Sequence, residues 1–413
     1  MEATSSEDKS RRGSGSKLLR LMTALVAALA ASAAGTALAT PEPVSPAPQA
    51  SENCGKVQER LRAHGSGGQT TLCAQTATPR TQWTVREVPR ASGRAESDPA
   101  GGVSARGLRP DPAPRAVPRY CPTRLDAIVT AGRFRSCAKS LVTYFELDNR
   151  GVVIGRATFA GTFWAQLRPR ARSWVYNLKL NGFRGTGTLA GGFYLAASGR
   201  CIGGCRIYAA RPPDGTLARL GPGAPVQGSW TMGSPGRRTL SHRFNAVLTA
   251  YVPGAVNGAR ASFDYLNRTR CDSASYLQSS GCVYPVNPGL FRLSAAPGSG
   301  VTQAAAFYRD AQQSLPNHAG RLDGPPLRRT RNVATIRANR AAARRRCATL
   351  LGPRPPDRQC DEYPFASARS TTSAFRVRYV VDRQNERVGG LLGNFYREQR
   401  ILDRDTFYAQ IVG

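Results

Sequence analysis

Two adjacent carboxylates, Asp361 and Glu362, stand in the segment Cys360–Ala366, beside a cysteine and ahead of the rigid Pro364. Carboxylates can act as general bases and can bind divalent cations through oxygen. In an extended segment adjacent side chains point to opposite faces, so both reach one site only if the backbone bends. An isolated Asp-Glu pair is more often a surface pair. The neighbouring residues are therefore needed to decide whether this pair belongs to a functional site.

A polar cluster at residues 382–387 is followed by apolar residues at helical spacing, namely Val388, Leu391, Leu392 and Phe395. The cluster is therefore expected at the start of a helix, where backbone N–H groups also favour anions. Carboxylate and amide oxygens suit Mg²⁺ or Mn²⁺. A carboxylate, a strand and then a helix with an amide at its head can build a one-metal phosphodiesterase site.

The strand expected between them is residues 375–381, whose apolar and polar residues alternate. We expect Phe375, Val377, Tyr379 and Val381 to face inward, and Arg376, Arg378 and Val380 to face outward. Four arginines are predicted to hold phosphates: Arg376, Arg378, Arg383 and Arg387. Such contacts are largely blind to base sequence. A final strand is expected from about Thr406.

Two helices are expected upstream, at residues 301–315 and 331–351. In the second, one stripe at helical spacing is mostly apolar: Val333, Ile336, Arg340, Ala343 and Cys347. The rest of its surface carries Arg331, Arg337, Arg344, Arg345 and Arg346. This basic surface fits a solvated face and a phosphate-binding face equally well.

Residues 118–298 show period-two patterns and recurring turn signals. Trp174, Tyr176, Leu178 and Leu180 alternate with other residues, and residues 244–252 resemble a further strand. A β-sandwich-like domain of about seven to nine strands is therefore expected.

The N-terminal residues predict the compartment. A basic stretch and an apolar run end at Ala37-Leu38-Ala39, which is typical of a secretory signal peptide over residues 1–39. We expect a secreted, extracellular protein without a membrane span in the mature chain. Residues 40–117 are rich in Pro, Gly and Arg and are expected to be a mostly irregular linker.

The composition favours polyanionic partners and disulfides. The net charge is +32, with 53 Arg and 5 Lys, a ratio that also fits a GC-rich genome. Ten cysteines indicate an oxidising compartment. Neighbouring cysteines are the expected partners, although sequence alone does not prove connectivity: Cys54 with Cys73, Cys121 with Cys137, Cys201 with Cys205, and Cys271 with Cys282. Neither a Gly-x-Ser-x-Gly elbow nor a phosphate-binding Gly-Lys-Ser/Thr loop is evident.

The segments CDEYPFA, QNERVGGLLGNFY and RILDRDTFY together resemble the C-terminal domain of secreted NucA/NucB-type deoxyribonucleases, over roughly residues 325–413. The resemblance implies an α+β nuclease domain of the ββα-metal (His-Me finger) superfamily, here spanning residues 299–413 with its helical lead-in. In this family an acidic residue replaces the usual histidine base, which agrees with the absence of histidine after His318.

The resemblance assigns roles to particular residues. It makes Asp361 the general base, Glu362 its neighbour in the site and Asn385 a metal or phosphate contact. The metal ligand stays open among Glu362, Asn385 and Glu386. The resemblance also suggests that Cys360 is joined to Cys347.

We therefore expect a monomeric, Mg²⁺- or Mn²⁺-dependent endonuclease of low sequence specificity that favours DNA over RNA. Its β-domain would position the nuclease or bind an anionic cell-wall polymer. One alternative is a non-catalytic surface or wall-binding protein, which metal-dependent turnover would distinguish. Another is a nuclease toxin that acts on competitors and needs an immunity partner.

Overall fold

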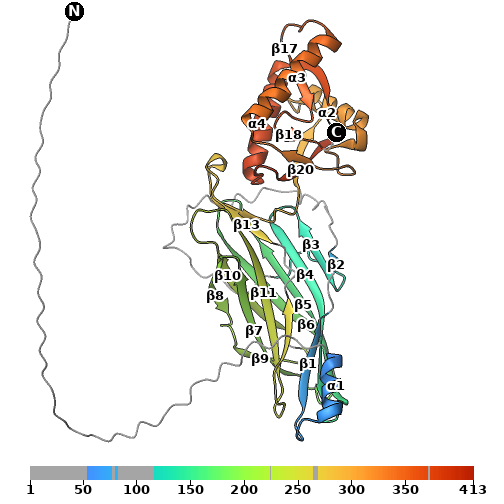
Figure 1. The fold of residues 1–413 in the computed structure, drawn as a ribbon, viewed down its shortest axis with the longest axis vertical. Coiled ribbons are helices and arrows are strands. Elements are labelled where there is room, and N and C mark those ends of the chain that lie inside the picture. The colour runs from blue at the N-terminus through green and yellow to red at the C-terminus, as the bar shows by residue number, and fades with distance from the viewer. Residues whose placement is uncertain (1–53, 77–79, 82–115, 224, 264–267, 371–372) are drawn as a thin grey trace, which may run out of the picture. The chain divides into compact units, whose positions relative to one another are not determined.

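The computed structural model describes residues 54–76, 80–81, 116–223, 225–263, 268–370 and 373–413 (Figure 1). The predicted signal peptide and most of the predicted linker lie outside these residues. Within the described part, no helix combines the length and the apolar character needed to cross a bilayer.

The β-rich region contains two sheets. The strands of the first are β1 (Thr71–Thr76), β2 (Arg80–Thr81), β3 (Ala127–Ala131), β4 (Arg135–Leu147), β5 (Val153–Gln166), β6 (Ser173–Gly187), β8 (Arg206–Arg211) and β10 (Val226–Gly233). Their order is β2-β3-β4-β5-β6-β10-β8, and β1 pairs with β4. The strands of the second are β7 (Phe193–Ile202), β9 (Leu217–Leu220), β11 (Leu240–Tyr251), β12 (Ala259–Phe263), β13 (Thr269–Asp272) and β14 (Gly281–Val283). Their order is β14-β13-β11-β7-β9, and β12 pairs with β11.

One hydrophobic core joins the two sheets. Tyr176 of β6 stacks on Phe244 of β11 with ring centroids 4.4 Å apart, and the Tyr144 hydroxyl of β4 donates to the Leu248 carbonyl of β11. The predicted alternation in β6 is confirmed, because Trp174, Tyr176, Leu178 and Leu180 are all buried. The all-β prediction is therefore correct. Twelve of the fourteen strands described in these sheets lie in residues 118–298, more than the seven to nine predicted there, because several are too short to show a period.

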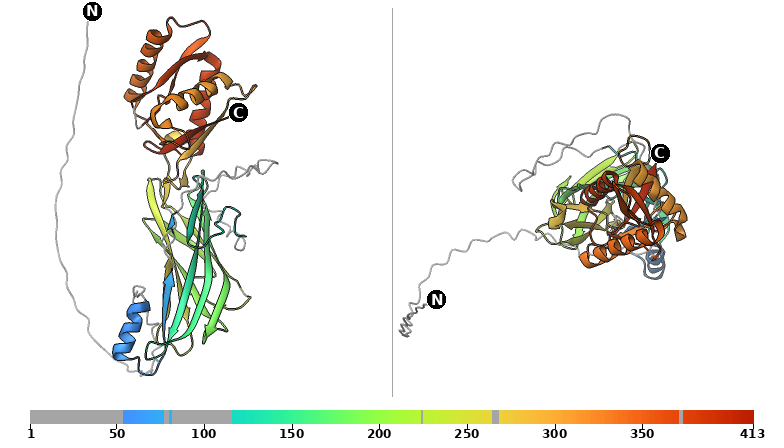
Figure 2. Two further views of the ribbon diagram at one scale, coloured as in Figure 1. Left: turned by 90° about the vertical axis from the view of Figure 1, so that its right-hand side faces the viewer. Right: turned by 90° about the horizontal axis from the view of Figure 1, so that it is seen from above.

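Residues 54–76, within the segment predicted to be a mostly irregular linker, contain regular structure. They form α1 (Cys54–His64) and β1, which are joined by the Cys54–Cys73 disulfide. Figure 2 shows α1, in blue, beside the strands. Val57 and Leu61 pack with Leu147 in a small separate core. The buried residues of α1 are Cys54, Val57 and Leu61, and their spacing of three and four residues was a helical signal in the sequence.

Five disulfides occur, and each joins cysteines that are neighbours in the sequence. They are Cys54–Cys73, Cys121–Cys137, Cys201–Cys205, Cys271–Cys282 and Cys347–Cys360. The last of these joins a helix to a strand of the C-terminal region, where the candidate site lies.

The C-terminal region has two sheets and three α-helices. The strands β15 (Gly289–Ser294), β16 (Leu327–Arg329), β18 (Ala368–Arg369) and β20 (Thr406–Val412) form a sheet of order β15-β20-β16-β18. The strands β17 (Arg358–Tyr363) and β19 (Arg376–Val381) form an antiparallel pair. The helices are α2 (Thr302–Ser314), α3 (Val333–Leu351) and α4 (Asp382–Glu398). Short 3₁₀ turns are η1 (Ser275–Leu277) and η2 (Pro316–His318).

The predicted boundary after residue 298 falls inside this region. β15 was assigned to the β-domain, but it pairs in parallel with β20, with Gly289 opposite Phe407. Phe291 of β15 also packs against Phe395 of α4 in the C-terminal core. The C-terminal unit therefore begins at or before Gly289.

The strand β19 is covered on both faces, which corrects the predicted orientation. Arg376 and Arg378 face α2, whereas Phe375 lies beneath Arg346 of α3 and the Tyr379 hydroxyl donates to the Gly352 carbonyl at the end of α3. Val380, expected outside, is completely buried, and Val377, Tyr379 and Val381 are half-buried. Leu391 of α4 is also more exposed than its predicted apolar stripe implied.

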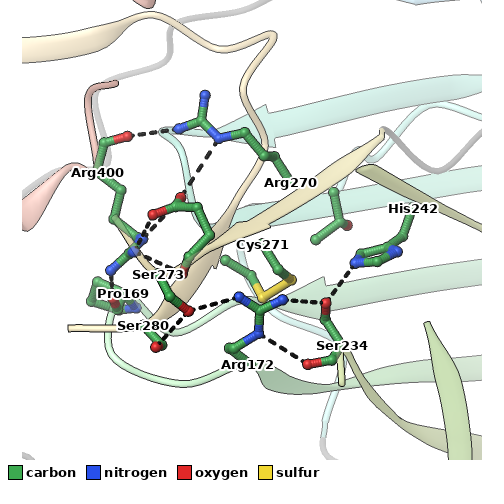
Figure 3. The surroundings of a disulfide bond; sticks show 12 residues. Pro169, Arg172, Ser234, His242, Arg270, Cys271, Ser273, Ser280 and Arg400 are labelled. Carbon is green, nitrogen blue, oxygen red and sulfur yellow. Dashed lines mark hydrogen bonds and ion pairs between the residues drawn. A yellow bond between two sulfur atoms is a disulfide. The ribbon is translucent and has the colours of Figure 1, made fainter. Parts of the chain in front are cut away.

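A buried polar cluster connects the β-rich region to the segment after α4 (Figure 3). Arg400 forms an ion pair with Asp272 of β13 and donates to the Pro169 carbonyl over 2.7 Å. Arg270 donates to the Arg400 carbonyl over 2.8 Å and to Asp405 over 2.6 Å. Because each guanidinium has a carboxylate or carbonyl partner, these charges can be buried.

Candidate active site

A cavity of about 640 Å³ opens among β17, β19, α3 and α4. Its wall contains five carboxylate or amide side chains and three arginines. The residues that line it are Tyr308, Arg340, Arg344, Arg354, Gln359, Cys360, Asp361, Glu362, Phe365, Ala366, Ser367, Tyr379, Asn385, Glu386, Val388, Gly389 and Leu392. All the predicted catalytic and metal-binding residues are therefore on one surface.

Asp361 is the deepest carboxylate of the cavity, and only 5% of it is exposed. Its Oδ2 accepts a hydrogen bond from the Tyr308 hydroxyl over 2.6 Å, and its Oδ1 accepts one from the Glu362 N–H over 2.9 Å. Burial raises the pKa of Asp361 to about 7, although the hydrogen bond from Tyr308 acts in the opposite direction. A carboxylate with such a pKa can accept a proton near neutral pH.

Glu362 reaches the same cavity although it is the next residue along the strand. The chain turns after Tyr363, and Glu362 Oε1 accepts the Ala366 N–H over 3.1 Å. Burial raises the pKa of Glu362, whereas this hydrogen bond and the charges of Arg340 and Arg344 oppose the rise. Asp361 and Glu362 are consecutive residues in the regular pair of β17 and β19, and both line the cavity. Asp361 contacts α2 and Glu362 lies near the arginines of α3, so a bend between them is not what brings them together.

Asn385 and Glu386 enter the cavity from the first turns of α4. The Asn385 amide donates to Gln359 Oε1 over 3.2 Å, and the Gln359 amide donates to Glu386 Oε1 over 3.4 Å. Gln359, which sequence reasoning missed, thus connects the head of α4 to β17. The sequence did contain a signal for Gln359. It stands two residues before Asp361 on one strand, and residues with this spacing share a face of the strand.

The donor set fits a hydrated divalent cation. Oxygen atoms of Glu362, Asn385 and Glu386 all line the cavity. Among the described residues, no group of three or more His, Cys, Asp or Glu side chains is placed to hold a metal ion by itself. Mg²⁺ usually keeps several waters and takes only one or two carboxylates from the protein. An open site of this composition suits it.

None of the four predicted phosphate-binding arginines lines the cavity. Arg376 donates to the Ser314 carbonyl over 2.8 Å, and Arg378 forms an exposed ion pair with Asp310, so both lie against α2. Arg383 and Arg387 are exposed on α4. All four residues adjoin the motifs in the sequence, but Arg376 and Arg378 extend along α2 to Ser314 and Asp310 rather than into the cavity.

Arg340, Arg344 and Arg354 line the cavity instead. Arg340 and Arg344 are four residues apart on α3 and therefore lie on one helix face. The Cys347–Cys360 disulfide fixes the same helix to β17, immediately before Asp361. The spacing of Arg340, Arg344 and Cys347 on one helix face was a signal in the sequence, but only the disulfide shows that this face meets the carboxylates.

A second group with the residue types of a catalytic site lies in the β-rich region (Figure 3). The His242 Nδ1 bonds to the Gly203 carbonyl over 2.8 Å, so its Nε2 accepts from the Ser234 hydroxyl over 2.9 Å. Arg172 also donates to Ser234. Because Ser234 and His242 are only 4% and 2% exposed, a substrate cannot reach this pair, and it is a structural hydrogen-bond network.

Comparisons with known proteins bear on the C-terminal region. No curated protein matches the chain. The crystal structure of the cupredoxin domain of amoB from Nitrosocaldus yellowstonii matches 22% of this chain and 55% of its own, with 13% identity and a TM-score of 0.14, a similarity too low to support an argument. Residues 321–410 match the family model described as Deoxyribonuclease NucA/NucB, and the chain therefore carries a NucA/NucB deoxyribonuclease domain that contains every residue lining the candidate site except Tyr308.

Proposed function

We propose that the protein is a secreted, metal-dependent endonuclease that hydrolyses phosphodiester bonds of DNA with little sequence specificity. One observation carries the proposal. A single cavity of the NucA/NucB domain combines a buried carboxylate with a raised pKa, further oxygen donors and three arginines. Phosphodiester hydrolysis needs these groups together: a base, oxygen ligands and positive charge.

Asp361 acts as the general base in this proposal. Its carboxylate accepts a proton from water as the water oxygen bonds to phosphorus and the bond from phosphorus to the leaving ester oxygen breaks. Glu362, Asn385 and Glu386 would hold the divalent cation. When bound, that cation supplies positive charge to the phosphate in the transition state. Arg340, Arg344 and Arg354 would bind the phosphates and orient the strand at Asp361.

The order of elements agrees with the ββα-metal architecture. The antiparallel strands β17 and β19 are followed directly by α4, and the candidate base and metal ligands lie on β17 and at the head of α4. In this arrangement Asp361 occupies the role that a histidine has in other members of the superfamily. The five disulfides support a secreted protein, because such bonds persist in oxidising compartments.

The guanidinium groups in the cavity favour contact with phosphates rather than bases. Phosphate contacts carry no direct sequence information, so cleavage should depend little on base sequence. The matching family is described as a deoxyribonuclease, which favours DNA over RNA as the substrate.

The test is nicking of supercoiled plasmid by the disulfide-intact protein with Mg²⁺, with Mn²⁺ or with EDTA. Asp361→Asn is compared with Asp323→Asn, which removes an exposed carboxylate on the same domain. We expect metal-dependent nicking that Asp361→Asn lowers by about 10²-fold or more, the range for loss of a general base. A single-stranded RNA arm tests the preference for DNA.

Absence of cleavage by the folded protein with either metal would overturn the enzyme proposal and favour a non-catalytic binding protein. Cleavage that survives Asp361→Asn would keep the nuclease and remove Asp361 as its base.

A further inference from the structure

The helix α2 contributes a residue to the candidate site, although it precedes the segment that matches the nuclease family. The family match begins at residue 321, and α2 ends at Ser314. Tyr308, near the middle of α2, lines the cavity together with Asp361. We propose that Tyr308 is a positioning residue that orients the Asp361 carboxylate for general-base catalysis, an inference that rests on the proposed function.

The contact with Asp361 is direct and well suited to orientation. The Tyr308 hydroxyl donates to Oδ2 over 2.6 Å, while the Glu362 N–H donates to Oδ1 over 2.9 Å. One bond on each oxygen fixes the plane of the carboxylate, since rotation about the bond from Cβ to Cγ would break both. Each carboxylate oxygen keeps a further lone pair, so the bonded carboxylate can still accept a proton from water.

Tyr308 is itself held rigidly. It is only 1% exposed, and its ring packs against Tyr363 and Phe365 with centroids 5.7 Å and 5.2 Å away. One turn later in α2, the Gln312 amide donates to the Ala409 carbonyl over 2.7 Å. The hydroxyl of Tyr308 therefore has little freedom to move away from Asp361.

The other end of α2 is fixed to the head of α4. The Gln384 side chain accepts the Gln303 N–H over 2.8 Å, and the Gln303 side chain accepts the Val381 N–H over 2.9 Å. Gln384 immediately precedes Asn385. One helix thus contacts both the base on β17 and the segment that carries the other site residues, so the catalytic unit includes α2.

The orienting role has a kinetic consequence. Misplacement of a reacting group by about 1 Å can lower a rate by about 10²-fold without loss of substrate binding. Tyr308→Phe removes only the hydroxyl and keeps the ring. We expect kcat to fall by about 10-fold to 100-fold while KM changes by less than about two-fold.

Tyr363→Phe is the matched control. Tyr363 is also a fully buried tyrosine of the same core, and its hydroxyl accepts from Gln312 and donates to the Ala319 carbonyl. It does not line the cavity. Tyr308→Phe loses one buried hydrogen bond and Tyr363→Phe loses two, so a purely structural role for Tyr308 predicts an effect of Tyr363→Phe on kcat that is at least as large. We expect Tyr363→Phe to lower the melting temperature and to leave kcat unchanged.

The measurement is plasmid nicking kinetics of the full chain, at a temperature where near-ultraviolet circular dichroism shows each variant to be folded. A thermodynamic cycle adds Tyr308→Phe to Asp361→Asn, with affinity for uncleaved DNA as a second readout. If Tyr308 acts through Asp361, the second substitution causes no further loss of rate, and Tyr308→Phe leaves DNA affinity unchanged in both backgrounds.

Three results would overturn the inference. They are an unchanged kcat in Tyr308→Phe, an equal loss in Tyr363→Phe, or additive losses in the cycle. In each of them the wild-type protein still cleaves DNA, so the proposed function survives. A wild-type protein that is inactive with both metals overturns the proposed function itself.

Discussion

At the scale of single residues, burial of the ionised Asp361 carboxylate destabilises the folded protein. Its pKa rises from 3.8 to about 7 on folding, chiefly because of burial. The folded protein therefore binds a proton more tightly than the unfolded chain, and this stabilisation is complete below about pH 4 and is lost as the pH rises toward 7. Three pKa units correspond to at most about 4 kcal/mol.

Asp361→Asn should therefore stabilise the metal-free protein at pH 8 and weaken its pH dependence between pH 4 and 7. The measurement is the free energy of unfolding by urea across this range in EDTA. Asp323→Asn, on the exposed surface, is the control and should leave the profile unchanged. Equal stability of Asp361→Asn and wild type at pH 8 would contradict the raised pKa.

The arginines of the cavity should dominate binding of the nucleic-acid backbone. Arg340→Gln or Arg344→Gln should weaken binding about uniformly across DNA sequences and lower the salt slope of log Kd by about one, because one phosphate contact is lost. Fluorescence anisotropy with labelled duplexes at several salt concentrations measures this slope. Asp361→Asn as the background prevents cleavage.

Arg376→Gln makes the same change of charge on a residue that bonds to Ser314 and lies outside the cavity. It should leave the salt slope unchanged. An equal reduction by Arg376→Gln and Arg340→Gln would show that net charge, rather than the cavity, determines binding.

The residues of the site differ in how well the sequence predicts them. Asp361, Glu362 and Asn385 stand in short motifs, so their meeting in one cavity follows from a strand and a helix that are close in sequence. Tyr308 and Arg340 depend on packing between distant segments. Tyr308 is 53 residues from its partner Asp361, and no local period marks it. Buried tyrosines on a helix are usually core residues, and the contact with the base distinguishes this one.

At the scale of elements, α4 contains glycines that the packing of the described residues does not require. A Cβ atom added at Gly389 or Gly390 would meet no atom within 4 Å. Glycine inside a helix costs about 0.5–1 kcal/mol relative to alanine. Gly389 lines the cavity and Gly390 does not, so the two positions form a natural pair for comparison.

Gly390→Ala should raise the free energy of unfolding by about 0.5–1 kcal/mol without loss of activity. Gly389→Ala should stabilise by a similar amount but raise KM, because the added methyl group stands where the DNA strand approaches α4. Urea unfolding and nicking kinetics of both variants measure the two effects. Full activity in Gly389→Ala would show that the substrate does not approach this face of the helix.

The elements themselves were predicted where a period extends over several turns or residues. The helices α2, α3 and α4 and the strands β6, β11 and β20 lie close to their expected ranges. The strand β15 was placed in the wrong region because its six residues pair with β20, which is more than a hundred residues later. The predicted orientation of β19 was wrong because helices pack on both faces of this strand. Alternation of apolar and polar residues then no longer distinguishes the core face from the solvent face.

At the scale of the whole molecule, three buried arginines and two aspartates join the β-rich region to the nuclease domain. Arg133 and Arg270 both form ion pairs with Asp405, and Arg400 pairs with Asp272. Arg133 and Asp405 are 272 residues apart, so no sequence pattern predicts their contact. Removal of one partner from a buried pair leaves an uncompensated charge and costs about 3–5 kcal/mol.

Asp405→Asn should therefore destabilise the protein by about 3 kcal/mol or more and uncouple the unfolding of the two regions. Trp164, Trp174 and Trp230 are buried in the β-rich region and no tryptophan follows residue 230, so their fluorescence reports on that region. Hydrogen exchange of β17 and β19 reports on the nuclease domain. In the wild type both probes should give one urea transition. In Asp405→Asn the amides of β17 and β19 should exchange at urea concentrations where the fluorescence is still native. Coincident transitions in Asp405→Asn would instead show that the cluster is not what couples the two regions.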